Sequence, residues 1–151
     1  MRARAGALAL AALALAAGAL AGCATSYAGD SPKQVQQWAA AAPYDADNAQ
    51  IQSDLGDLAN GLAEHQLQPL KTACEAFSID VDTLYTTLPT PDTTVTDELN
   101  AALSTWGRAA EDCYGAPSFS SARFAKYRAE LKSARAEYAK AQRRLRTFGV
   151  K

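Results

Sequence analysis

The 151-residue sequence has one histidine, His65, and one methionine, Met1. A single histidine cannot build a multi-histidine zinc or copper site, and the Glu-x-x-His pairs of di-iron bundles are absent. Cys-x-x-Cys, Cys-x-x-Cys-His, Gly-x-Ser-x-Gly and a glycine-rich phosphate loop are absent too. These absences argue against thioredoxin-type redox centres, covalent haem attachment, and the common hydrolase and nucleotide sites. We therefore expect no catalytic residues, no metal and no cofactor.

The charges are distributed unevenly along the chain. Fifteen Lys and Arg against 16 Asp and Glu give a formal net charge of −1. Residues 23–117 carry 14 acids and three basic residues, a net of −11, whereas residues 118–151 carry ten basic residues and two acids, a net of +8. The near-neutral total argues against a simple nucleic-acid-binding protein. The length suits one domain.

The first 22 residues have the order of a secretory signal. Arg2 and Arg4 precede an uncharged Ala/Leu run over residues 5–20, which leads into small residues. A positive start, an apolar run and a small-residue cleavage site are typical of a signal peptide. The run is shorter than the roughly 20 residues that span a bilayer, and no Arg-Arg pair indicates twin-arginine export. We expect residues 1–22 to be removed on export.

The apolar run ends in Leu20-Ala21-Gly22-Cys23. This tetrapeptide resembles the lipobox of bacterial lipoproteins, which are cut just before the cysteine. In that family the cysteine sulfur receives a diacylglycerol, and the amino group is often acylated. The resemblance implies that Cys23 anchors an exported protein to the cell membrane, facing outside the cytoplasm. Two or more acyl chains give stable attachment, so Cys23 would be a permanent anchor. Residues 23–30 would then form a tether, and residues 31–151 would form the folded domain.

Beyond the lipobox, the chain resembles small, Ala-rich, helical envelope lipoproteins of high-GC Gram-positive bacteria. Its 35 alanines and the helical periodicity of its apolar residues carry this resemblance. The sequence contains no motif of a specific functional family. The resemblance therefore implies a place in the cell envelope and leaves the activity open.

Without Cys23, two cysteines remain in the exported part, Cys74 and Cys113. An even number of cysteines outside the cytosol is expected to pair. We predict a structural disulfide between them, and the alternative is a redox-sensing pair of free thiols. If the two helices that carry them meet at a turn near Pro91, the spacing requires this turn to be asymmetric.

Helical periodicity dominates the exported chain. Ser31-Pro32 predicts the start of a short helix that ends before Pro43. Apolar residues then recur at steps of three and four in four longer segments: Ile51 to Leu62, Leu70 to Leu88, Val95 to Cys113, and Phe124 to Phe148. No segment alternates with the period of a half-buried strand. The predicted fold is all-α, an antiparallel bundle of about four long helices plus a short N-terminal helix.

Two groups of residues are candidates for a contact surface. Trp38 and Tyr44 lie outside the long apolar stripes of the helices. Arg143, Arg144 and Arg146 belong to the basic last helix, for which two interpretations stand. The helix either packs against the acidic helices, or its outer face meets anionic lipid or an acidic envelope polymer.

The sequence thus predicts a membrane-anchored, non-enzymatic helical module that contacts an envelope partner. The alternative is a binding protein that holds a small apolar or lipidic ligand between its helices. Nucleic acid is not expected as a partner of an exported lipoprotein. A cavity faced by Trp106 or Tyr85 would favour the ligand, whereas an exposed patch around Trp38 and Tyr44 would favour a protein partner.

Overall fold

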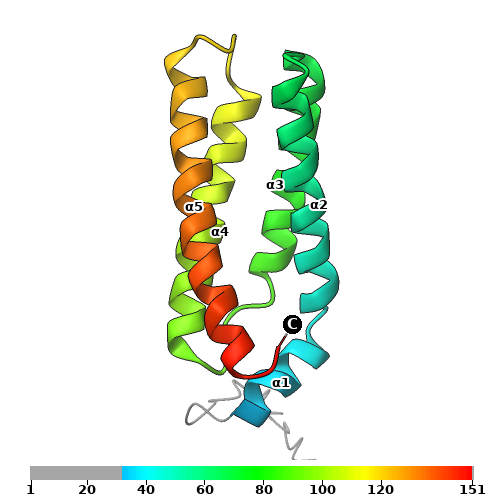
Figure 1. Cartoon of the computed structure of the whole chain (residues 1–151), viewed down its shortest axis with the longest axis vertical. Coiled ribbons are helices and arrows are strands. Elements are labelled where there is room, and N and C mark those ends of the chain that lie inside the picture. The colour runs from blue at the N-terminus through cyan, green and yellow to red at the C-terminus, as the bar shows by residue number, and fades with distance from the viewer. Residues whose placement is uncertain (1–31, 151) are drawn as a thin grey trace, which may run out of the picture.

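The computed structural model describes residues 32–150, which form five helices and no strand (Figure 1). The helices are α1 (Pro32–Ala41), α2 (Tyr44–Ala63), α3 (Leu67–Tyr85), α4 (Thr93–Tyr114) and α5 (Ala122–Thr147). The four long helices form an up-and-down bundle, with α1 at one end. The predicted all-α bundle is therefore confirmed. The signal peptide, Cys23 and the 23–30 tether lie outside the described residues.

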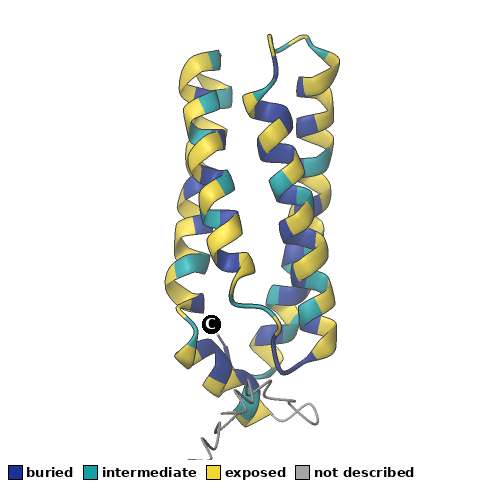
Figure 2. Cartoon of the chain, turned by 180° about the vertical axis from the view of Figure 1, so that it is seen from behind, coloured by how far each residue is buried: buried dark blue, intermediate teal, exposed yellow. Residues whose placement is uncertain are grey.

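The apolar stripes predicted from the sequence form the core. Buried positions lie on the inward faces of the helices, and exposed positions lie on the outer faces (Figure 2). The stripe of α5 is buried along its whole length: Phe124, Tyr127, Leu131, Ala134, Tyr138, Ala141 and Leu145. Burial of these side chains supplies the main favourable free energy of folding.

Two helices begin at side-chain caps. The Asp92 carboxylate accepts a hydrogen bond from the backbone N–H of Val95 at 2.7 Å and is the N-cap of α4. The Ser121 hydroxyl accepts one from the N–H of Phe124 at 3.1 Å and caps α5. Such caps satisfy backbone donors that the first helical turn leaves without a partner.

Helix α3 ends at Tyr85, three residues before the end of its apolar periodicity. The hydroxyls of Thr86 and Thr87 each donate to a carbonyl three residues back, at 2.7 Å. These local bonds compete with further helical hydrogen bonds. Pro89 then disfavours helical geometry at the residue before it.

The disulfide between Cys74 and Cys113 is present and joins α3 to α4, with the two Cα atoms 6.2 Å apart. Cys74 lies 11 residues before the end of α3 at Tyr85, whereas Cys113 lies 20 residues after the start of α4 at Thr93. The difference of nine residues is about 13 Å along a helix. The connection over residues 86–92 covers it by running along the bundle axis (Figure 1). The predicted asymmetric turn is confirmed.

The bundle is not equally closed on all sides. Helix α5 packs along α4, α4 along α3, and α3 along α2, but the backbones of α2 and α5 do not pack closely against each other (Figure 1). Side chains bridge this last pair of helices. This open side positions the candidate site.

Candidate functional site: a groove between α2 and α5

A groove of about 610 Å³ lies between α2 and α5. This volume falls within the range of roughly 300–1,000 Å³ that is usual for small-molecule sites. Ten residues line it: Asn48, Gln52 and Leu55 from α2, Trp106 from α4, and Arg135, Tyr138, Ala139, Gln142, Arg143 and Arg146 from α5. The groove therefore uses the first twelve residues of α2 and the second half of α5.

The least exposed lining residues are Leu55, Trp106 and Tyr138. The rings of Trp106 and Tyr138 lie 4.6 Å apart between centroids, and the ring of Phe77 packs edge-on against Trp106 with the centroids 5.6 Å apart. The indole N–H of Trp106 is buried and has no hydrogen-bond acceptor among the described residues. A buried donor without a partner is uncommon in native proteins. The floor of the groove thus combines apolar surface with one unsatisfied donor.

A polar network joins α2 to α5 beside this floor. The Tyr138 hydroxyl donates to Asn48 Oδ1 at 2.7 Å. Gln142 Nε2 donates to the Tyr44 hydroxyl at 2.6 Å and to Asn48 Oδ1 at 3.3 Å. Burial raises the pKa of Tyr138 to about 12 and also raises the pKa of Tyr44. Both hydroxyls therefore keep their protons near neutral pH.

Three exposed arginines form the rim of the groove: Arg135, Arg143 and Arg146. None of them forms an ion pair with a carboxylate of residues 32–150. Arg135 only donates a long hydrogen bond, 3.5 Å, to the carbonyl of Leu55. None of the described Asp or Glu residues lines the groove, so the formal charge of its ten lining residues is +3. The site is suited to an anionic group.

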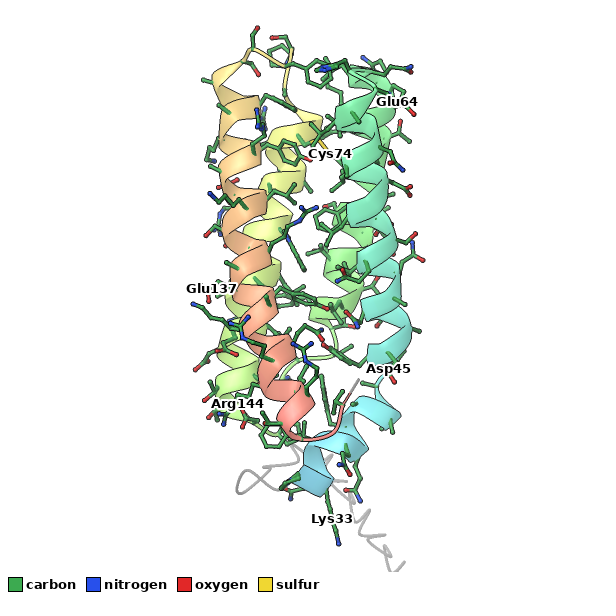
Figure 3. All side chains as sticks on the ribbon, viewed as in Figure 1. Lys33, Asp45, Glu64, Cys74, Glu137 and Arg144 are labelled. Atoms are coloured by element: carbon green, nitrogen blue, oxygen red, sulfur yellow. A yellow bond between two sulfur atoms is a disulfide. The ribbon has the colours of Figure 1, made fainter. Side chains whose placement is uncertain are left out.

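Arg144 has a different role from its two neighbours in the sequence. Its guanidinium donates two hydrogen bonds to the buried carboxylate of Asp92, from Nε at 2.8 Å and from Nη2 at 2.6 Å. The hydrogen bonds from Arg144 lower the pKa of Asp92, against the opposing effect of burial. Figure 3 shows Arg144 at the end of the bundle that also carries α1 and Lys33. Of the three predicted arginines, Arg144 packs internally, whereas Arg143 and Arg146 lie on the rim.

The structure corrects the expected contact surface at Trp38 and Tyr44. Only 6% of Trp38 and 0% of Tyr44 is exposed. The Trp38 indole donates to the carbonyl of Thr87 at 2.9 Å, and its ring lies 4.9 Å from that of Tyr44. A ten-residue helix is marginal by itself, so α1 is stabilised by burying its apolar face against the end of the bundle. Both aromatic residues therefore belong to the core.

Asp54 is a buried acid that was not among the residues predicted from the sequence. It is 4% exposed on α2, and Gln50 Nε2 donates to its Oδ1 at 3.0 Å. Among the described residues, no donor reaches its Oδ2. Burial first, and then Asp80, raises the pKa of Asp54 to about 6. Its position three residues after Ile51, on the buried stripe of α2, was a signal for this burial.

Two other residues noted in the sequence, His65 and Tyr85, lie away from the groove. His65 is exposed at the turn after α2, with its ring edge-on to Phe119. Tyr85 is 45% exposed and donates to Asn100, so it does not face the groove. Within residues 32–150, His, Cys, Asp and Glu side chains form no group of three suited to a metal ion.

Of the polar lining residues, Arg143 and Arg146 were among the predicted contact residues, whereas Asn48, Gln52, Arg135 and Gln142 were not predicted. Asn48, Gln52 and Leu55 follow helical steps of four and three, as do Arg135, Ala139, Gln142 and Arg146. This shared spacing places each set on one helix face, but it does not say that the two faces oppose each other.

Among the described helices, none has the length and apolar character needed to cross a bilayer. Comparison with protein-family models, with curated proteins and with solved structures finds no match to this chain.

Proposed function

We propose that the mature protein is an exported lipoprotein, anchored through Cys23, whose helical domain is a non-enzymatic binding module for a lipidic ligand with an acidic group. One observation carries this proposal. The α2/α5 groove joins an apolar floor at Trp106 to a rim of arginines without carboxylate partners. Such a surface is complementary to a molecule with an apolar body and a negative head. A purely apolar ligand would leave these arginines without a partner.

A protein partner in the envelope is the second candidate. It is favoured by exposed apolar side chains on the opposite, α3/α4 face, where Ile79 is 62% and Tyr114 is 57% exposed. Burial of Trp38 and Tyr44 removes the aromatic patch that would have supported such a partner most strongly. Single exposed apolar residues are common on soluble domains, so this face is the weaker argument.

The lipid anchor is tested by metabolic labelling with a fatty acid and by flotation of the protein with membranes. The wild-type chain is expected to incorporate label and to float, and Cys23→Ser is expected to do neither. Equal labelling of Cys23→Ser would contradict the anchor. Replacement of Cys74 and Cys113 together by Ala is the matched control, because it removes two cysteines and leaves Cys23 in place.

The groove is tested with octyl phosphate and n-octanol, which share an alkyl chain and differ in charge. The readout is the ¹⁵N–¹H signal of the Trp106 indole, which a Trp38→Phe variant distinguishes from the only other indole. We expect octyl phosphate to shift the Trp106 signal at a lower concentration than octanol. An unchanged signal with both compounds would contradict ligand binding in the groove.

A further inference from the structure

We propose that the groove takes the phosphate headgroup of an anionic phospholipid from the same membrane that holds the Cys23 anchor. The bound headgroup then holds the domain against that membrane. This inference rests on the proposed lipid anchor, and it names both the ligand class and its source.

The groove reaches the end of the bundle where α1 lies. Helix α1 and the C-terminal end of α5 lie at the same end of the bundle (Figure 1). From Arg146 at that end, the rim extends back to Arg135, 11 residues or about 16 Å along the helix. Pro32 is nine residues after Cys23, and this stretch reaches about 30 Å when fully extended. The tether is therefore long enough for the groove to meet the headgroup layer.

The basic residues along α5 differ in whether they form ion pairs. Five of them form no ion pair with a described carboxylate, and we call them the basic stripe: Arg128, Lys132, Arg135, Arg143 and Arg146. Other basic residues of the helix are paired, such as Arg123 and Lys126 with Asp112. The unpaired charges thus extend from the groove rim along one helix. Such a cluster attracts the negative surface of an anionic membrane.

The lining of the groove offers both hydrogen-bond donors and apolar surface. Guanidinium groups donate paired hydrogen bonds to phosphate oxygens. Arg143 and Arg146 lie on the rim of the groove and supply two such groups. The unsatisfied indole N–H of Trp106 supplies a further donor at the floor. Leu55 and Tyr138 offer apolar surface for the glycerol and the first acyl carbons. The described lining has no carboxylate to pair with the amine of a zwitterionic headgroup, so the site favours a net negative lipid.

The test uses the lipidated protein in two kinds of vesicle, phosphatidylcholine alone and phosphatidylcholine with 30 mol% phosphatidylglycerol. Flotation with both vesicles reports the anchor, and amide hydrogen exchange reports the groove. We expect exchange over residues 48–55 and 135–146 to slow at least threefold in the anionic vesicles only. The difference should shrink in high salt, because ions screen the attraction.

The test variant is Arg135→Gln/Arg143→Gln/Arg146→Gln. Its matched control is Lys33→Gln/Lys71→Gln/Arg108→Gln, which removes the same charge outside the groove. The proposal expects the first triple variant to lose the protection and the second to keep it. Equal loss in both variants would mean that net charge alone is responsible, and this result would overturn a specific site.

Other outcomes of this experiment distinguish the headgroup site from the lipid anchor and from binding of an acidic polymer. Protein that floats with both vesicles but shows the same exchange in both would overturn the headgroup site while leaving the anchor intact. Protein that floats with neither would refute the anchor. Soluble polyglutamate that protects the same segments as well as anionic vesicles do would assign the stripe to an acidic polymer and overturn the lipid proposal.

Discussion

Arg144 forms a two-pronged ion pair with Asp92, which links the last turns of α5 to the N-cap of α4. The carboxylate has no exposed surface, and it also accepts the hydrogen bond from the N–H of Val95 at 2.7 Å. One acid thus caps a helix and holds a neighbouring helix in register. Its charge is buried and depends on Arg144 for compensation.

Replacing Arg144 by Ala is expected to lower the free energy of unfolding by about 2–4 kcal/mol, because it leaves the Asp92 carboxylate buried without its cation. Urea unfolding followed by circular dichroism measures the change. Arg143→Ala is the matched control in the adjacent position, and it should change stability by less than about 0.5 kcal/mol. Equal losses for the two variants would show that the ion pair contributes nothing specific.

Asp54 should make the protein less stable as the pH rises from 5 to 7.5. Its pKa is raised to about 6 in the folded state, so folding retains a proton that the unfolded chain releases near pH 4. The stability gained by this proton is present at low pH and is lost as the pH rises through 6. Asp54→Asn keeps the shape of the protonated acid. It should stabilise the protein at pH 7.5 by about 2 kcal/mol and flatten its pH dependence between 5 and 7.

Thermal unfolding at several pH values tests the Asp54 prediction. Asp97→Asn, exposed on α4, is the control and should leave the slope unchanged. Below pH 4 the trend should reverse, because Asp92 and Asp112 have lowered pKa values and their ion pairs are lost on protonation. A wild-type stability that does not fall between pH 5 and 7 would contradict the role given to Asp54.

Removing the disulfide by Cys74→Ala/Cys113→Ala should lower the free energy of unfolding by about 3–4 kcal/mol, because the reduced unfolded chain has more conformational freedom. Chemical denaturation of the oxidised protein, the reduced protein and the double variant provides the measurement. Cys23→Ser is the control and should leave the stability of the domain unchanged. If the double variant is as stable as the wild type, the bridge does not stabilise the fold.

Trp38→Ala should cost about 3–5 kcal/mol, because it empties a buried site at the junction of α1 with the bundle. Tyr114→Ala removes a comparably large side chain that is 57% exposed, and it should cost far less. Protection of α1 amides from hydrogen exchange should be lost in Trp38→Ala only. Full protection of α1 in that variant would show that Trp38 does not hold the helix.

The sequence by itself determined the helical class, the approximate bounds of the five helices and the cysteine pairing. The steps of three and four along α5 identify every buried residue of that helix, because a regular helix turns by the same angle at each residue. Asp92 was recognisable as a cap because it follows Pro91 and precedes an apolar periodicity. These features depend on local geometry or on the parity of cysteines, both of which are visible in one dimension.

Only the tertiary structure decided which faces meet across the bundle. Helical spacing places Arg143, Arg144 and Arg146 within one turn, yet Arg144 turns to Asp92 while the other two border the groove. Adjacent residues differ by about 100° around the helix, so the rotation of α5 about its own axis decides which of them faces α4 and which borders the groove. The burial of Trp38 and the open side between α2 and α5 depend likewise on how the helices pack, which the spacing along each helix does not specify.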